Sequence, residues 1–245
     1  MDRKKELLTY LSGALGQIFI ISIVVFLLRS FEMKIDYTTA LGMLAIGIGG
    51  ISSALWGTIV TIRYKRATLK EILLDFVNVR QPFSSYILVF VFLLLDFALQ
   101  GGQFQINGWY IPIILFLKAI LFGGIEEIGW RYTFQPILEE KFNYIISTII
   151  TFVSWGIWHL LYFYIEGSLY HVVVTEFMLG LLINCFILSA LYNKTRSLWI
   201  CVMTHALINM ISQISNGGNF YLSIIYKGII IIIAIVVSHK AKSRV

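Results

Sequence analysis

The chain has 245 residues, of which 58% are hydrophobic and only 13% are charged, and its mean hydropathy is +0.84. A soluble domain carries about a quarter charged residues, so this composition excludes an ordinary soluble protein and indicates a polytopic membrane protein. The net charge of +6 does not indicate a nucleic-acid partner. The basic residues lie in short patches between apolar segments, where they set membrane topology.

Apolar segments of about 20 residues, the length that crosses the hydrocarbon core of a bilayer, follow one another along the chain. The first is interpreted as a span and not as a signal peptide, because it is long and lacks a small-residue cleavage site. The sequence therefore predicts an all-α, polytopic membrane bundle of about eight transmembrane helices. The expected spans are residues 8–28, 40–63, 84–100, 110–135, 145–165, 169–191, 197–214 and 220–238.

Three regions are expected along the chain. Residues 1–109 would hold the N-terminal transmembrane helices and an amphipathic connector, residues 110–215 a functional core, and residues 216–245 a last helix with a basic tail. The connector, Arg63 to Gln81, mixes basic and apolar residues at the spacing of a short amphipathic helix on the membrane surface. We interpret it as an interfacial connector, with recruitment of a substrate to anionic lipid as the alternative.

The positions of lysine and arginine predict the orientation. With the N-terminus in the cytoplasm, most basic residues between spans fall on the cytoplasmic side, and only Arg29 and Lys34 lie outside. Both termini are therefore expected in the cytoplasm. The predicted location is the plasma (cytoplasmic) membrane, with several passes.

The fourth span ends in an unusual stretch, Gly123-Gly124-Ile125-Glu126-Glu127-Ile128-Gly129-Trp130-Arg131. Ionisable groups inside a membrane segment are costly and usually mark function. On a regular helix Glu127 and Arg131 share a face and are expected to form an ion pair, whereas Glu126 points about 100° away and can address another helix. Pro136 is expected to end this helix. The alternative is that both glutamates belong to a structural ionic network.

Polar residues also occur in the fifth and seventh spans. Trp155 precedes His159 by one helical turn, and His205 and Asn209 are four residues apart and share a face. Counted from the predicted cytoplasmic ends, Glu126, His159 and His205 lie at depths that agree to roughly 10 Å. A shared site in the cytoplasmic half of the bilayer is therefore expected, with polar packing between helices as the alternative.

These residue types fit two hydrolytic mechanisms. A glutamate and a histidine can activate water, while a second histidine and an amide stabilise an oxyanion. Alternatively, Glu126, His159 and His205 would hold a catalytic zinc, although no HExxH motif fixes the geometry. A serine or cysteine nucleophile is not favoured: no GxSxG motif occurs, and Cys185 and Cys201 lie in apolar segments without CxxC spacing.

Together these residues resemble the CPBP family of intramembrane proteases, which includes the CAAX prenyl endopeptidases and the bacteriocin-processing Abi proteins. The resemblance covers about residues 110 to 215. The motifs that carry it are Glu126-Glu127-x-x-x-Arg131, Trp155-x-x-x-His159 and His205-x-x-x-Asn209. One departure is Trp155, where the family usually has phenylalanine; an aromatic packing role would be preserved.

The resemblance implies a role for each residue. Glu126 and His159 would activate the water, and His205 with Asn209 would stabilise the oxyanion. Glu127, Arg131 and Trp155 would give structural support. No cofactor is favoured, and zinc is the alternative, because the family has been described both as metalloproteases and as metal-independent glutamate proteases.

The predicted function is therefore an intramembrane endopeptidase acting on membrane-anchored peptides or proteins. The rival is a non-catalytic membrane protein for bacteriocin self-immunity or partner binding, and a transporter is disfavoured because no internal symmetry is visible. Asp96 and Glu176 are interpreted as structural or interfacial charges, with lining of the same cavity as the alternative. The sequence leaves the substrate and the oligomeric state open.

Overall fold

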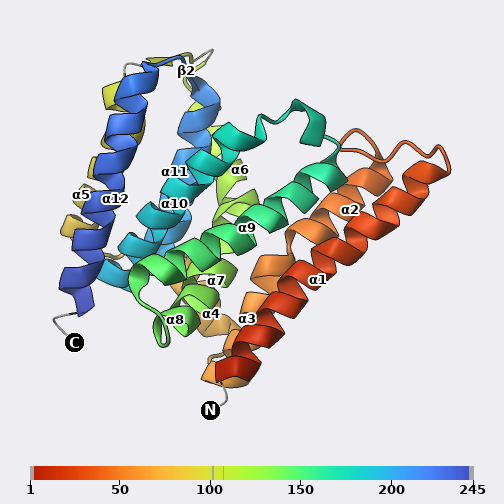
Figure 1. Ribbon diagram of the computed structural model, residues 1–245, viewed down its shortest axis with the longest axis horizontal. Coiled ribbons are helices and arrows are strands. Elements are labelled where there is room, and N and C mark those ends of the chain that lie inside the picture. Colours follow the sequence, from red (N-terminus) through yellow and green to blue (C-terminus); the bar gives the residue numbers. More distant parts are fainter. Residues whose placement is uncertain (1–2, 101, 107, 243–245) are drawn as a thin grey trace.

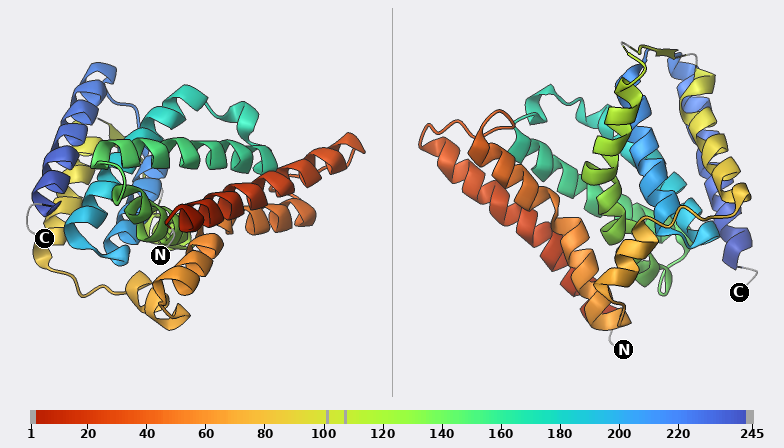
Figure 2. Two further views of the ribbon diagram at one scale, coloured as in Figure 1. Left: turned by 60° about the horizontal axis from the view of Figure 1, so that its bottom comes forward. Right: turned by 180° about the vertical axis from the view of Figure 1, so that it is seen from behind.

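The computed structural model describes residues 3–100, 102–106 and 108–242, and it is almost entirely helical (Figures 1 and 2). The α-helices are α1 (Arg3–Ser30), α2 (Ala40–Gly50), α3 (Ser52–Lys65), α4 (Leu69–Phe76), α5 (Phe83–Asp96), α6 (Ile111–Phe122), α7 (Glu127–Gly129), α8 (Gln135–Glu139), α9 (Tyr144–Glu166), α10 (Val174–Thr195), α11 (Leu198–Ile214) and α12 (Phe220–Lys242). The 3₁₀ turns are η1 (Ala98–Gln100), η2 (Gly124–Glu126) and η4 (Leu169–His171), and η3 (Trp130–Phe134) is a π-helix. Strands β1 (Gln103–Phe104) and β2 (Ser215–Asn216) form a short antiparallel pair.

Five helical segments in the described part are long and apolar enough to cross a membrane: α1, Ala40–Lys65 (α2 with α3), α9, α10 and Phe220–His239 in α12. Helices α5 and α11 are apolar but shorter. The chain is thus an integral, multi-pass, all-α membrane protein, as predicted. The first turn of α1 and the last turns of α12 lie at the same end of the bundle (Figure 1). The number of eight spans, the cytoplasmic termini and the kind of membrane stay predictions.

Helix α9 crosses the middle of the molecule (Figure 1). Helices α1 and α2 pack against it on one side and α10 on the other, while α11 packs against α6. Large aromatic side chains fill the junction: Trp130, Trp155 and Trp158 are at most 1% exposed. Tyr10 of α1 stacks on Phe134 with ring centroids 5.0 Å apart, which ties the first helix to this core.

The fourth predicted span is not one helix. Helix α6 ends at Phe122, and the chain continues through η2, the short α7 and the π-helical η3 into α8. The side-chain hydroxyl of Thr133 bonds the carbonyl oxygens of Ile128 (2.8 Å) and Gly57 (3.1 Å), which satisfies backbone groups at the irregular turn. π-Helical turns inside helices are frequent at functional sites.

The prediction that Pro136 ends this helix is wrong. Pro136 lies in the first turn of α8, where its missing N–H removes no intrahelical hydrogen bond. The chain turns only after Glu139, before Asn143 caps the start of α9 by accepting a hydrogen bond from the backbone N–H of Ile146.

Glycines bring neighbouring helices unusually close to this broken segment. A Cβ atom on Gly124 would lie 2.8 Å from Cγ1 of Val202 in α11, and a Cβ atom on Gly57 in α3 would lie 2.7 Å from the Cα atom of Gly129. Gly124 and Gly129 therefore permit close helix approach, and the broken segment is held between α3 and α11.

The polar connection predicted as an amphipathic helix contains α4. Thr68 and Glu71 form a capping box at its start, and Leu69, Leu73 and Leu74 are each more than half exposed. Exposed leucines beside basic residues suit a helix at the membrane interface. Its position on a bilayer surface stays a prediction.

Candidate active site

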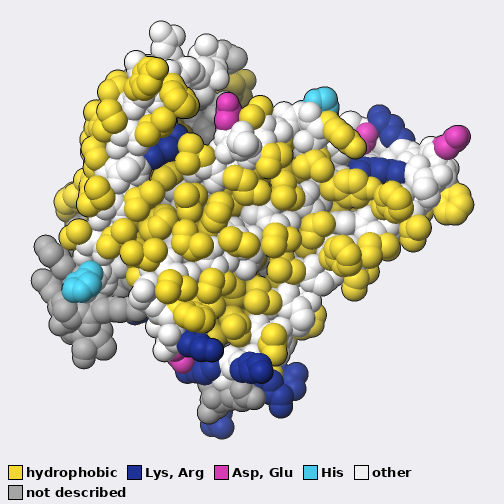
Figure 3. Space-filling model, viewed as in Figure 1, with side chains coloured by type: hydrophobic (Ala, Val, Ile, Leu, Met, Phe, Trp, Pro, Cys, Tyr) yellow, Lys and Arg dark blue, Asp and Glu magenta, His cyan; other side chains and the backbone are white. Residues whose placement is uncertain are grey.

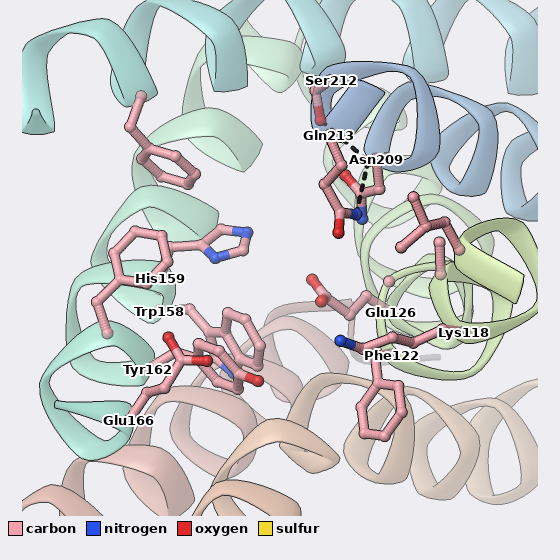
Figure 4. Close-up of a pocket in the computed structure, with 15 residues that line it drawn as sticks. Lys118, Phe122, Glu126, Trp158, His159, Tyr162, Glu166, Asn209, Ser212 and Gln213 are labelled. Atoms are coloured by element: carbon pink, nitrogen blue, oxygen red, sulfur yellow. Dashed lines mark hydrogen bonds between the residues drawn. The ribbon is translucent and has the colours of Figure 1, made fainter. Parts of the chain in front are cut away.

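The polar residues of the three motifs gather around one pocket. It has a volume of about 540 Å³ and lies between α6, α9 and α11, and Glu126, His159 and Asn209 all line it (Figure 4). The sequence predicted Glu126, His159 and His205 at similar depth on separate helices, and the structure brings Glu126, His159 and Asn209, one turn after His205, to the same pocket.

Glu126 is buried at the base of the pocket, with 4% of its surface exposed. Its Oε2 atom accepts a hydrogen bond from the indole Nε1–H of Trp155 at 2.7 Å. Trp155 therefore does more than the aromatic packing expected of it, because it fixes the orientation of the carboxylate. A packing phenylalanine would supply no such donor.

His159 faces Glu126 across the pocket (Figure 4). Its Nδ1 atom is buried and has no hydrogen-bond partner among the described residues. Aromatic rings surround the imidazole, including Trp158 and Phe177, each with its ring centroid 5.0 Å away. The imidazole lines the pocket opposite the Glu126 carboxylate, so it can contact a bound water or a polar substrate group there.

Glu127 lies between Arg131 and His205 and contacts both side chains. Its Oε1 atom lies 3.5 Å from Nη1 of Arg131, which confirms the predicted ion pair, and 2.7 Å from Nδ1 of His205. Glu127 and Arg131 are 0% exposed, and the guanidinium Cζ of Arg131 lies 4.3 Å from the ring centroid of Trp155. The contact between Glu127 and His205 was not predicted, and it leaves Nε2 as the free nitrogen of that imidazole.

His205 and Asn209 both approach the break in the fourth span. A Cβ atom on Gly123 would lie 3.2 Å from Nε2 of His205 and 2.5 Å from Nδ2 of Asn209. The backbone carbonyl of Asn209 accepts hydrogen bonds from Ser212 (3.0 Å) and Gln213 (2.8 Å). The two side-chain nitrogens are therefore held beside a residue without a side chain, where a substrate can approach.

The alternative zinc site stays a prediction. Within the described residues, no group of three or more His, Cys, Asp or Glu side chains is placed to hold a metal ion. Of the three candidate ligands, Glu126 accepts from Trp155, and His205 contacts Glu127 through Nδ1. A histidine that binds a metal usually hydrogen-bonds a carboxylate through its other ring nitrogen, so the contact with Glu127 is compatible with both mechanisms.

The pocket lining includes residues that were not predicted, among them Lys118, Tyr162, Glu166 and Phe177. Tyr162 and Glu166 follow His159 by three and seven residues, so helical periodicity places all three on one face of α9. That spacing was a usable signal in the sequence. Phe177 on α10 carried no comparable signal.

The side of the membrane toward which the pocket extends depends on the orientation of the chain, which stays a prediction. Its outer lining, including Leu115, Glu166 and Gln213, comes from the beginning of α6 and the ends of α9 and α11. These ends lie away from the first turn of α1 (Figure 1). With cytoplasmic termini, the pocket extends toward the outer half of the membrane, whereas the sequence predicted the cytoplasmic half.

Asp96 and Glu176 line a neighbouring cavity of about 530 Å³, together with Lys227. Asn209 and Ser212 belong to the walls of both cavities. The interpretation of Asp96 and Glu176 as charges away from the catalytic pocket agrees with this placement, and their role stays open.

Comparison with known proteins covers the same region. Residues 107–211 match the model of the Rce1-like family, the type II CAAX prenyl endopeptidases. A CAAX prenyl protease 2 from Methanococcus maripaludis is 25% identical over 139 residues, which cover 51% of this chain and 50% of that protein. The two matches support the resemblance to the CPBP family that the motifs indicate. The chain spans about half the length of this curated relative.

Proposed function

We propose that this protein is an intramembrane endopeptidase of the CPBP type that hydrolyses a peptide bond in membrane-anchored peptides or proteins. The observation that carries the proposal is the single pocket onto which Glu126, His159 and Asn209 converge. The family match and the relative's name as a CAAX prenyl protease support this reaction class.

In the proposed reaction, a water molecule lies between the Glu126 carboxylate and His159. Glu126 takes a proton from the water as the oxygen attacks the carbonyl carbon of the scissile peptide bond. Glu126 then returns the proton to the leaving amine nitrogen as the C–N bond breaks. The products are a carboxylic acid and an amine, and no covalent enzyme intermediate forms.

The oxyanion of the tetrahedral intermediate is proposed to bind near Gly123. There the Nδ2 group of Asn209 and Nε2 of His205 supply hydrogen bonds. Because Glu127 holds the proton on Nδ1, His205 can donate from Nε2 only when both ring nitrogens carry protons. Glu127 and Arg131 therefore act as positioning residues behind His205.

We propose that the water is activated without a metal, because the Glu126 and His159 pair meets the need for a base. Cleavage is therefore expected to continue in the presence of a chelator. Complete loss on chelation with recovery on adding zinc would overturn this mechanism.

The test uses the purified full chain and a library of membrane-anchored peptides that includes prenylated CAAX peptides, with cleavage read by mass spectrometry. Glu126→Gln keeps the shape but removes the base, so it is expected to lower cleavage at least about 100-fold. Glu176→Gln, outside the pocket, is the matched control and should cleave like the wild type. If the folded wild-type protein cuts nothing in the library, the non-catalytic role in bacteriocin self-immunity or partner binding is favoured.

A further inference from the structure

A separate cavity of about 630 Å³ lies at the other end of the molecule, between the first two turns of α1 and the connection from α8 to α9. Its basic lining residues are Arg3, Lys4 and Lys141. Its apolar lining residues include Leu8, Ile137 and Phe142. No residue of the candidate active site belongs to it. Its lining is therefore amphipathic, and catalysis does not explain it.

The charges around this cavity are unbalanced. Arg3 is engaged by two carboxylates, with Nε 2.7 Å from Glu140 and Nη1 2.9 Å from Glu6. Lys4 and Lys141, by contrast, have no ion-pair partner within the part of the chain that the structure describes. Two ammonium groups from different segments therefore face one cavity, and among the described residues its only carboxylate, Glu140, already binds Arg3. Such a cavity attracts an anion.

The apolar part of the lining continues into the membrane-spanning surface. Leu8 is 54% exposed on the outside of α1, whereas Ile137 is only 4% exposed and forms an apolar wall. In Figure 3 basic side chains gather at the end of the molecule where α1 begins, next to a wide apolar surface. A ligand here would meet cations at its head and hydrocarbon along its length.

We propose that this cavity binds one anionic phospholipid, with its phosphate between Lys4 and Lys141 and an acyl chain along Leu8. An inorganic phosphate would satisfy the two lysines but would leave the apolar wall without a ligand. A zwitterionic lipid would cover the apolar wall but would bring its own cation to the lysines. Only an anionic lipid matches both parts of the lining.

The bound lipid would fasten α1 to the segment that follows the π-helical turn. Helix α8 continues directly from η3, which contains Arg131, and Arg3 already joins α1 to Glu140. A phosphate bound by Lys4 and Lys141 adds a second connection between the same two segments. Binding is therefore expected to stabilise the fold, whether or not the protein is a protease.

The experiment titrates the delipidated full chain in detergent with dioleoyl phosphatidylglycerol or dioleoyl phosphatidylcholine. Native mass spectrometry counts bound lipids, and thermal unfolding reports stabilisation. One phosphatidylglycerol is expected to bind at least about tenfold more tightly than phosphatidylcholine and to raise the unfolding temperature. Each lysine near an anionic lipid contributes about fivefold in affinity, so Lys4→Gln with Lys141→Gln is expected to weaken phosphatidylglycerol binding about 25-fold.

The matched control is Lys70→Gln with Arg80→Gln, which removes two exposed charges from residues outside the cavity. It should retain the affinity of the wild type within about twofold. If both double variants lost the same affinity for phosphatidylglycerol, the net charge and not the cavity would explain the binding, and the proposed site would be wrong. Glycerol 3-phosphate is the arm without an acyl chain: if it displaces the lipid at similar concentrations, the cavity is an anion site and the lipid assignment is wrong.

Discussion

Trp155 contacts both the proposed base, Glu126, and the positioning residues behind His205. Its indole N–H bonds Glu126, its ring lies under the guanidinium of Arg131, and its edge packs against the His205 ring with centroids 5.2 Å apart. One side chain therefore fixes a proposed base and contacts the positioning ion pair. Tryptophan thus supplies a donor that the phenylalanine expected from the family resemblance would lack.

Replacing Trp155 by phenylalanine tests this role. Trp155→Phe removes the donor to Glu126 and keeps an aromatic ring, so kcat is expected to fall about 10- to 100-fold, the value of one hydrogen bond to a charged group. Trp199→Phe is the matched control, because Trp199 does not line the pocket and its indole N–H has no hydrogen-bond partner among the described residues. Equal activity of Trp155→Phe and the wild type would contradict the assigned role.

Substitution of Glu127 tests its buried ion pair with Arg131. Glu127→Ala leaves the buried Arg131 without its carboxylate, which is expected to destabilise the protein by about 3–5 kcal/mol. The measurement is thermal unfolding in detergent together with the yield of folded protein. Glu140→Ala, which breaks a half-exposed contact with Arg3, should cost less than about 1 kcal/mol. A silent Glu127→Ala in both yield and activity would make the ion-pair assignment wrong.

The motifs predicted which residues gather in the site but not how they touch. Spacing along a regular helix was sufficient to pair Glu127 with Arg131, because that contact is local. The contacts of Glu127 with His205 and of Glu126 with Trp155 join different helices. They depend on how helices rotate against one another, which side-chain packing decides and one sequence does not encode locally.

At the scale of elements, the informative feature is the break between α6 and α8. Hydropathy correctly identified an apolar segment there, but it could not show that the segment is interrupted. The Gly123-Gly124 pair was the local signal, since kinks occur at glycines. The break itself is fixed by α11, whose His205 and Asn209 side chains occupy the space beside Gly123.

This close approach predicts a selective effect of Gly123→Ala. The new methyl group would lie 2.5 Å from Nδ2 of Asn209, the mobile end of a side chain, so Asn209 must move while the backbone can stay. Cleavage is expected to fall by up to about 100-fold, as for loss of an oxyanion donor, with little change in unfolding temperature. Gly180→Ala in α10, where a Cβ meets nothing within 4 Å, is the control. If Gly123→Ala instead lowered the unfolding temperature strongly, the loss of cleavage would be explained by disturbed packing and not by displacement of Asn209.

At the scale of the whole molecule, composition predicted the membrane and the all-α fold, because both depend on length and hydropathy along the chain. Long helices such as α1, α9 and α10 were found at nearly the expected positions. The direction of the pocket was not predictable in this way. The sequence gives the depth of a residue only along its own helix, whereas the mouth of a pocket depends on where neighbouring helices separate.

Labelling of single cysteines from outside intact cells tests which way the pocket faces. The native Cys185 and Cys201 are 0% exposed, so they should give little background with a membrane-impermeant maleimide. Tyr170 is 93% exposed and lies at the end toward which the pocket extends, whereas Lys70 lies on α4 near the first turn of α1. The distribution of basic residues predicts that Tyr170→Cys reacts in intact cells and that Lys70→Cys reacts only after permeabilisation. With that pattern, substrates in the outer half of the membrane would have the direct route to Glu126. The reverse pattern would contradict the predicted orientation, and cytoplasmic substrates would then have the direct route.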